Sequence, residues 1–183
     1  MKSRVTRAIT IITSLLILTP CWNCCGKELI LNNTPVQVYF SPEGGCTKAI
    51  VNEIDSAKSE VLVQAYSFTS RAIAKALLAA HKRGIDVEVI LDGTQVAEKY
   101  NPAKFLTHSG IPAFVDGQHT IAHNKIMIID RNTVITGSFN FTNAAEHKNA
   151  ENLIIIKSRE LAELYLENWK NHRKHSEQYR TLN

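Results

Sequence analysis

A histidine, a lysine and an aspartate stand at fixed spacings in residues 123–130, HNKIMIID, and the segment GSFN follows at 137–140. On a β-strand, residues two apart project from the same face, so His123 and Lys125 are predicted to lie side by side. By the same parity, Ser138 and Asn140 are predicted to lie together on the neighbouring segment. An imidazole, an ammonium, a hydroxyl and an amide around one point are suited to binding and attacking a phosphate group.

Asp130 is seven positions from His123, so a regular strand would direct its carboxylate to the opposite face. We therefore expect Asp130 to satisfy the turn around Arg131 and Asn132, or to pair with a buried donor, rather than to touch the phosphate. The alternative, in which His123 and Lys125 are ordinary strand residues, is less favoured. A charged group entering an apolar run must face a cleft or an anion, because burying it unpaired is costly.

The elements that must position these groups are those of an α/β domain, with a mixed sheet flanked by helices on both faces. Strands are predicted at residues 36–40, 61–66, 86–91, 112–115, 126–129, 133–136 and 152–156. Helices are predicted around residues 50–57, between Ser70 and Gly84, irregularly over 94–110, and over 159–172. Ser70 is expected to cap its helix and Gly84 to end it, and a tight turn at 130–132 is expected to join two strands into a hairpin.

The first residues are typical of a secretory signal peptide: Lys2, Arg4 and Arg7 precede an apolar run over residues 8–18. This run is about half of the ~20 residues that a bilayer-spanning helix needs, so a stable membrane anchor is the weaker interpretation. We expect a signal peptide over residues 1–26, with an uncertain cleavage site, and one domain over 27–183. The expected location is the periplasm or the exterior.

The net charge of the whole chain is +4, but three of its positive charges lie in the predicted leader, which leaves a value near +1. Affinity for nucleic acid would therefore depend on local clusters such as Lys82-Arg83 and residues 170–174, which are equally well explained as solvated helix ends. Three of the four cysteines also fall in the leader. A disulfide framework in the remaining domain is not indicated.

The pattern His-x-Lys, four residues, Asp, six residues, Gly-Ser-x-Asn resembles the motif of the phospholipase D superfamily, with every fixed position filled. Ser41-Pro42 and residues 65–70 extend the resemblance to the small Nuc-type bacterial endonucleases. The resemblance implies an α/β/α sandwich and places Glu151 where a glutamate orients the histidine; the alternative for Glu151 is a surface acid at the start of a strand. The candidate catalytic residues are thus His123, Lys125, Asp130 and Glu151, and the candidate substrate-binding residues are Lys125, Ser138 and Asn140.

The resemblance also implies a metal-independent phosphodiesterase that forms a covalent phosphohistidine at His123. Because the motif occurs once, it implies a homodimer in which His123 of one subunit attacks while the second copy acts as general acid at the two-fold axis. The leading hypothesis is a non-specific endonuclease that hydrolyses DNA, and RNA as a second substrate. We expect no cofactor, and activity that resists EDTA.

Three alternatives accompany this hypothesis. A phospholipase D-type hydrolase of lipid headgroups would use the same catalytic groups, although no dedicated membrane-binding helix is evident. A catalytically silent phosphate-binding protein would require the loss of a motif residue, and none is lost. A zinc site would rest on the pairs His119/His123 and His172/His175; the first spacing suits zinc only on a helix, and the second is predicted to lie in a basic tail without further ligands.

Overall fold

The computed structural model describes residues 26–96 and 102–180. The predicted signal peptide therefore lies almost entirely outside the described residues, as does part of the predicted irregular stretch at 94–110. The described residues from Leu31 onward form one compact unit. Among the residues that are described, no helix combines the length and apolar character needed to span a bilayer.

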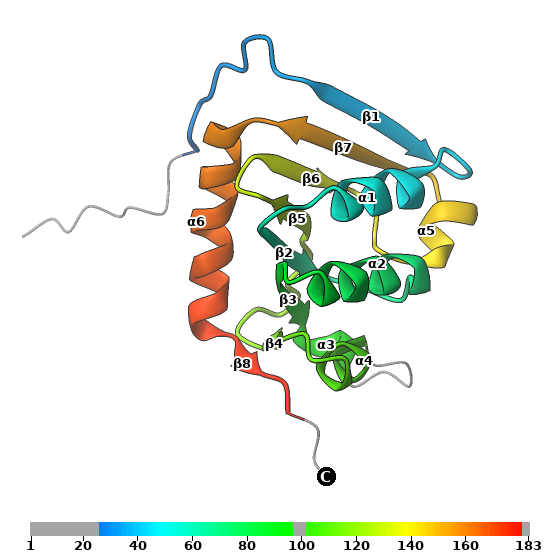
Figure 1. Cartoon of the computed structure of the whole chain (residues 1–183), viewed down its shortest axis with the longest axis vertical. Coiled ribbons are helices and arrows are strands. Elements are labelled where there is room, and N and C mark those ends of the chain that lie inside the picture. Colours follow the sequence, from blue (N-terminus) through cyan, green and yellow to red (C-terminus); the bar gives the residue numbers. More distant parts are fainter. Residues whose placement is uncertain (1–25, 97–101, 181–183) are drawn as a thin grey trace, which may run out of the picture. The chain divides into compact units, whose positions relative to one another are not determined.

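The unit contains helices and strands that alternate along the chain (Figure 1). In chain order they are β1 (Val36–Ser41), α1 (Cys46–Asp55), β2 (Glu60–Ala65), α2 (Arg71–Lys82), β3 (Asp86–Asp92), α3 (Gly93–Val96), α4 (Pro102–His108), β4 (Ala113–Asp116), β5 (Lys125–Ile129), β6 (Thr133–Gly137), α5 (Asn143–His147), β7 (Glu151–Lys157), α6 (Arg159–His175) and β8 (Glu177–Gln178).

The strands form one mixed sheet in the order β1-β7-β6-β5-β2-β3-β4-β8. The central strands β2, β3 and β4 are parallel, whereas β5, β6, β7 and β1 follow one another outward in antiparallel pairs. The carboxyl ends of β1, β2, β3, β4 and β6 therefore meet the amino ends of β5 and β7 at one edge of the sheet. In open α/β sheets, ligands bind at the edge where the parallel strands end.

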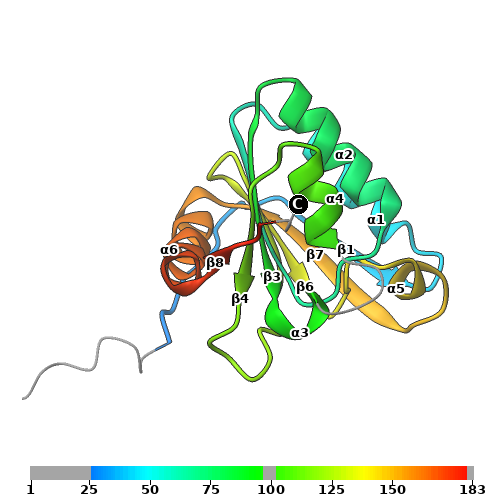
Figure 2. The same ribbon diagram turned by 90° about the horizontal axis from the view of Figure 1, so that it is seen from below.

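Helices cover both faces of this sheet, which confirms the predicted α/β/α sandwich. Figure 2 shows α6 on one side and α1, α2 and α4 on the other. The larger core lies on one face of the sheet, where α1 and α2 pack against alternate residues of the central strands. The smaller core lies on the other face, where α6 packs against the intervening residues of the same strands. Trp169 of α6 anchors the smaller core, because its indole N–H donates to the Val63 carbonyl of β2 at 3.0 Å.

The local signals of the sequence placed most elements correctly. The Ser70 hydroxyl accepts the Ile73 N–H, and Gly84 adopts a left-handed φ of 86° just after α2. Asp130 and Arg131 adopt positive φ in the turn between β5 and β6. Three features differ from prediction: α5 and β8 were not expected, and α6 extends to His175, so that His172 and His175 belong to a helix rather than to a tail.

Candidate active site

The motif residues gather at the edge where the parallel strands end. Lys125 is the first residue of β5 and lies opposite Ala65, the last residue of β2. The Tyr66 N–H donates to the Asn124 carbonyl at 2.8 Å, so the β2–β5 pairing continues past the end of β2 toward His123. His123 therefore lies just before the first residue of a buried strand, and its side chain is exposed.

Tyr66 is a site residue that the sequence analysis did not single out. Its ring lies 4.6 Å from the His123 imidazole, centroid to centroid, at an interplanar angle of 52°. The Lys125 ammonium lies 5.0 Å from the centroid of the same ring, within cation–π range. Its sequence signals were its place at the end of the predicted strand 61–66 and within residues 65–70, which resemble the Nuc-type endonucleases. Tyr66 thus contacts both polar groups of the motif and limits their movement.

Lys125 is buried, with 6% of its surface exposed, and its Nζ donates to the His123 carbonyl at 2.8 Å. Burial lowers the pKa of Lys125 below its ordinary value, and the Glu151 carboxylate opposes that effect. Residues two apart on a strand share a face, so Lys125 lies on the face of Met127 and Ile129. In the same way, Glu151 lies on the face of Leu153 and Ile155. These four apolar residues belong to the same core. Lys125 and Glu151 thus lie on one face of the sheet, as the predicted site requires.

Glu151 is fixed by contacts at the end of β1 and in the preceding loop. Its N–H donates to the Ser41 hydroxyl at 3.2 Å, and the same hydroxyl donates to the Asn149 carbonyl at 3.0 Å. One carboxylate oxygen of Glu151 accepts a hydrogen bond from the Asn149 amide at 3.0 Å. Ser41, which belongs to the segment that resembles the Nuc-type endonucleases, therefore holds the backbone of Glu151 directly.

Ser138 and Asn140 lie beyond β6, which ends at Gly137, so strand parity does not place them. The Ser138 hydroxyl accepts hydrogen bonds from the Asn152 N–H at 3.0 Å and the Asn152 side-chain amide at 3.3 Å. Gly137 is required here, because a Cβ at this position would lie 2.3 Å from the Asn152 carbonyl oxygen. Asn140 keeps a buried side-chain oxygen that makes no hydrogen bond within the described part of the chain.

Asp130 lies at the opposite end of β5 from His123, so its candidate catalytic role is corrected to a structural one. Its carboxylate accepts hydrogen bonds from the backbone N–H groups of Lys58, Ser59 and Glu60 and from the Ser59 hydroxyl. Burial alone would raise the pKa of Asp130, but these hydrogen bonds outweigh burial and hold it below its usual value. The structural role expected for Asp130 is confirmed, but the carboxylate accepts from residues 58–60 and not from the turn at 130–132.

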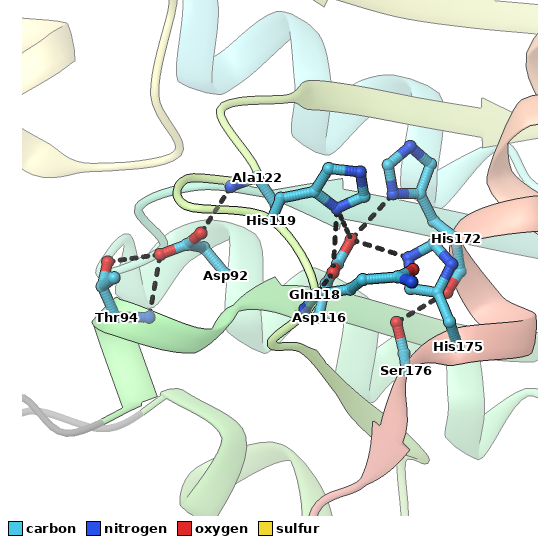
Figure 3. Close-up of polar contacts among 9 residues, drawn as sticks. All are labelled: Asp92, Thr94, Asp116, Gln118, His119, Ala122, His172, His175 and Ser176. Atoms are coloured by element: carbon cyan, nitrogen blue, oxygen red, sulfur yellow. Dashed lines mark hydrogen bonds and ion pairs between the residues drawn. The ribbon is translucent and has the colours of Figure 1, made fainter.

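Of the two histidine pairs considered for zinc, the fold brings His172 and His175 together but separates His119 from His123. The His123 ring packs at an angle against Tyr66, whereas His119 contacts Asp116 and lies beside the rings of His172 and His175 (Figure 3). The sequence spacing linked His119 to the wrong neighbour, because the four-residue separation from His123 falls in an irregular loop and not in a helix.

A hollow of about 690 Å³ lies between the N-terminal ends of α1 and α2 and the short helix α5. One bordering segment, residues 143–147, comes shortly after the motif in sequence, and Phe141 joins it to the start of α2: the N–H groups of Thr69 and Ser70 both donate to the Phe141 carbonyl at 2.9 Å. Exposed Lys48 and Arg71 line this hollow. Neither cation was singled out from the sequence.

The basic clusters that were singled out are partly engaged within the domain. The Arg83 guanidinium donates to the Ile54 carbonyl at 3.0 Å. Arg173 pairs with Glu88 at 3.2 Å and lies over the Phe114 ring. These contacts favour the interpretation of both clusters as structural helix ends.

Comparison with known proteins agrees with this geometry. A family model described as "Cardiolipin synthase, PLD-like domain" matches residues 50–173. A phospholipase D of Rickettsia felis is 47% identical over 141 residues, which cover 77% of this chain and 70% of that protein. The chain belongs to the phospholipase D superfamily. It is accordingly a phosphodiesterase, and the site at the sheet edge is the one that carries the superfamily motif.

Two solved structures are similar to this chain over nearly their whole length. Nuc from Salmonella typhimurium, a phospholipase D family member, has 42% sequence identity and a TM-score of 0.78, with 81% of this chain and 99% of that chain covered. NucT from Helicobacter pylori has a TM-score of 0.74 at 22% identity, with 80% and 99% covered, and supports the fold alone. The mitochondrial cardiolipin hydrolase of Canis lupus familiaris is 30% identical over 153 residues, or 78% of this chain and 59% of that protein.

Proposed function

We propose that this phospholipase D superfamily member is a metal-independent endonuclease that hydrolyses DNA. The observation that carries the proposal is the grouping of His123, Lys125 and Glu151 at one edge of the sheet. Lys48 and Arg71, together with Glu146, line a separate hollow that includes residues shortly after the motif in sequence. The 42% identity with Nuc across nearly all of that chain, and the resemblance of residues 41–42 and 65–70 to the Nuc-type endonucleases, support the nuclease. The predicted leader supports a further proposal, export to the periplasm or beyond.

His123 is the proposed nucleophile. Its exposed position just before the first residue of β5 lets a ring nitrogen approach a phosphorus atom in line. A nitrogen–phosphorus bond forms as the bond from phosphorus to the leaving oxygen breaks, which gives a phosphohistidine. Water then attacks the same phosphorus and releases His123 with its electron pair.

Lys125 and Asn140 are the proposed groups that hold the non-bridging oxygens. A buried ammonium on the same face as the nucleophile stabilises the negative charge of the transition state more strongly than an exposed one would. The unpartnered side-chain oxygen of Asn140 identifies an amide whose hydrogen bonds are not completed within the domain. The amide N–H groups of Asn140, and not its oxygen, are the donors from which a phosphate oxygen would accept, since both oxygens are acceptors.

The proposed active unit is a homodimer. In-line displacement needs a proton donor for the leaving oxygen on the side of phosphorus opposite the nucleophile, and the motif occurs once per chain. His123 of the partner subunit supplies that proton in the first step and removes one from water in the second. The two-fold axis would then pass through the active site.

A phospholipid hydrolase is the second candidate, and the naming of the Rickettsia relatives as phospholipase D favours it. The phosphohistidine chemistry does not depend on what the phosphate carries. The substrate is therefore decided by the surface outside the motif, and the hollow with Lys48 and Arg71 suits a polyanionic strand.

The deciding experiment presents plasmid DNA and phosphatidylcholine vesicles separately to the purified protein, each with excess EDTA. We expect nicked and linear DNA, no release of headgroup, and a loss of cleavage of about 10³-fold or more in His123→Ala. His108→Ala is the matched control, because His108 is exposed in α4 and outside the motif.

Each result bears on a different part of the proposal. Release of headgroup without DNA cleavage would replace the nuclease with the lipase. Loss of DNA cleavage in EDTA, while the protein stays folded at the assay temperature, would contradict the metal-independent mechanism. Retained cleavage in His123→Ala would remove His123 as nucleophile.

A further inference from the structure

A second cluster of potential ligands lies at the same sheet edge but outside the catalytic motif (Figure 3). Asp116 is the last residue of β4, and His119 lies in the loop that leads to β5. His172 and His175 lie in the final turns of α6, one helical turn apart. Segments more than fifty residues apart in the sequence thus direct one carboxylate and three imidazoles toward one point.

The geometry of the cluster is close to that of a tetrahedral metal site. Asp116 oxygens lie 3.1 Å from His119 Nδ1, 2.7 Å from His172 Nδ1 and 3.3 Å from His175 Nε2. The four potential ligand atoms all lie within 4.8 Å of one another. Ligands about 2.0–2.1 Å from a tetrahedral zinc ion lie about 3.4 Å apart, so small side-chain rotations would bring this set into position.

The chemistry of the donor set also suits zinc. Imidazole nitrogens and a carboxylate are its ordinary nitrogen and oxygen ligands. Asp116 is completely buried, and the three histidine rings surround it with centroids 4.9–5.3 Å apart. Three imidazoles drawn together around one buried carboxylate would repel one another if all were protonated, whereas neutral imidazoles can share a divalent cation.

We propose that Asp116, His119, His172 and His175 bind one zinc ion in a structural site. Four protein ligands complete the tetrahedron and leave no position for substrate, which is the arrangement of a structural rather than a catalytic ion. The ion would join the end of α6 to the loop between β4 and β5. It stands apart from the chemistry at His123, which remains metal-independent.

The proposed site has a specific mechanical consequence for the catalytic loop. His119 precedes His123 by four residues, and between them the Ala122 N–H donates to the buried Asp92 carboxylate at 2.6 Å. Figure 3 shows Asp92 and the cluster on either side of this loop. Zinc at His119 would add a second attachment on the other side of Ala122, so that the segment entering β5 is held at two points.

The first experiment measures metal content and stability. Protein purified without chelator is analysed by inductively coupled plasma mass spectrometry, and chelated protein is titrated with Zn²⁺ by calorimetry while its melting temperature is followed. We expect one zinc per chain and a higher melting temperature with Zn²⁺. His172→Ala and His175→Ala should lose both effects, and His108→Ala should retain them. Substoichiometric zinc with no thermal shift would overturn the site in favour of a metal-free hydrogen-bonded network.

The second experiment identifies a ligand without relying on a destabilised variant. His175→Cys replaces one zinc ligand with another, and Co²⁺ reports coordination by its visible spectrum. We expect tetrahedral cobalt bands in the unsubstituted protein and an added thiolate-to-cobalt band in His175→Cys. Absence of the thiolate band in a folded, cobalt-loaded variant would exclude residue 175 as a ligand.

The third measurement separates this inference from the proposed function. Cleavage of plasmid DNA is compared for zinc-loaded and chelated protein at a temperature where both are folded. We expect equal cleavage within about twofold, because the ion has no open position. Cleavage lost on chelation and restored by zinc without a change in folding would make the ion catalytic and overturn the structural assignment. Stoichiometric zinc with no DNA cleavage in either form would leave the site intact and contradict the nuclease proposal alone.

Discussion

Glu151 and Lys125 lie on the same face of the sheet at its active edge, with β6 between their strands. Burial lowers the pKa of Lys125, and the carboxylate of Glu151 limits that lowering. The pair therefore sets the pH range over which the buried amine stays charged. A charged amine is what the proposed phosphate site requires.

Glu151→Gln should narrow the pH range of activity from the alkaline side. Removing the negative charge takes away the influence that raises the pKa of Lys125, so the amine loses its proton at lower pH. We expect the alkaline limb of kcat/KM to move to lower pH, together with a fall of about 10²-fold in the maximum if Glu151 also orients His123. A pH–rate series measures both effects, and Glu163→Gln, an exposed change on α6, is the control. An unmoved alkaline limb would contradict the coupling.

Tyr66→Ala should lower kcat/KM for DNA by about 10-fold, because it removes an aromatic contact and a cation–π contact worth about 1–2 kcal/mol together. Tyr66→Phe keeps the ring against His123 and near Lys125 and should stay within about twofold of the unsubstituted protein. Steady-state kinetics on both variants tests this. An equal loss in both would show that the hydroxyl, and not the ring, is what the site uses.

The catalytic motif was predictable from the sequence because its parts are local. His123 and Lys125 are two residues apart, and the turn residues that separate β5 from β6 are consecutive, so periodicity and turn chemistry sufficed. Asp130 lies away from the site because it follows the far end of β5. Strand parity does not apply to Ser138 and Asn140, because β6 ends at Gly137 and the chain then follows the contacts of β7.

Residues that reach the site through non-local strand pairing carry no such signal. Tyr66 meets His123 only because β2 pairs with β5 across sixty residues of chain. The Asp116 cluster depends on how α6 crosses the sheet: the sequence spacing paired His172 with His175 but matched His119 with His123 instead of with them. Elements as short as β8, with two residues, are defined by their partner strand and not by their own pattern.

Asp130→Asn should destabilise the protein by about 2 kcal/mol while the folded enzyme keeps its activity, because a charged acceptor of several backbone N–H groups is lost. The folded pKa of Asp130 is lowered, so its contribution is present above the unfolded pKa of about 4 and is lost as the pH falls further. Urea unfolding at several pH values measures this. The difference from the unsubstituted protein should shrink below about pH 4.

Asp55→Asn is the matched control for that series, since Asp55 is exposed at the end of α1. It should change the unfolding free energy by no more than about 0.5 kcal/mol at any pH. A loss of kcat in folded Asp130→Asn at a permissive temperature would restore a catalytic role to Asp130.

Lys48→Ala combined with Arg71→Ala should weaken DNA binding without changing the chemistry. If both cations contact phosphates, KM for DNA should rise about 10-fold and the slope of log affinity against log salt should fall by about 2. Hydrolysis of a small phosphodiester such as bis(p-nitrophenyl) phosphate should not change. Lys82→Ala, an exposed cation at the end of α2, should leave the slope unaltered. An equal effect of Lys82→Ala would show that the DNA does not bind specifically at Lys48 and Arg71.

Dimers that carry one unsubstituted and one His123→Ala subunit should be nearly inactive. The proposed reaction uses both histidines, one as nucleophile and one as general acid. The mixed dimer has one histidine and so lacks either the nucleophile or the acid, whichever subunit attacks. Such dimers are isolated with two different affinity tags, and their cleavage rate is compared with that of unsubstituted dimers carrying the same tags. We expect less than about a tenth of the control rate, whereas two independent sites would retain about half. A rate near half, or full activity in a strictly monomeric protein, would show that one chain supplies both the nucleophile and the proton donor.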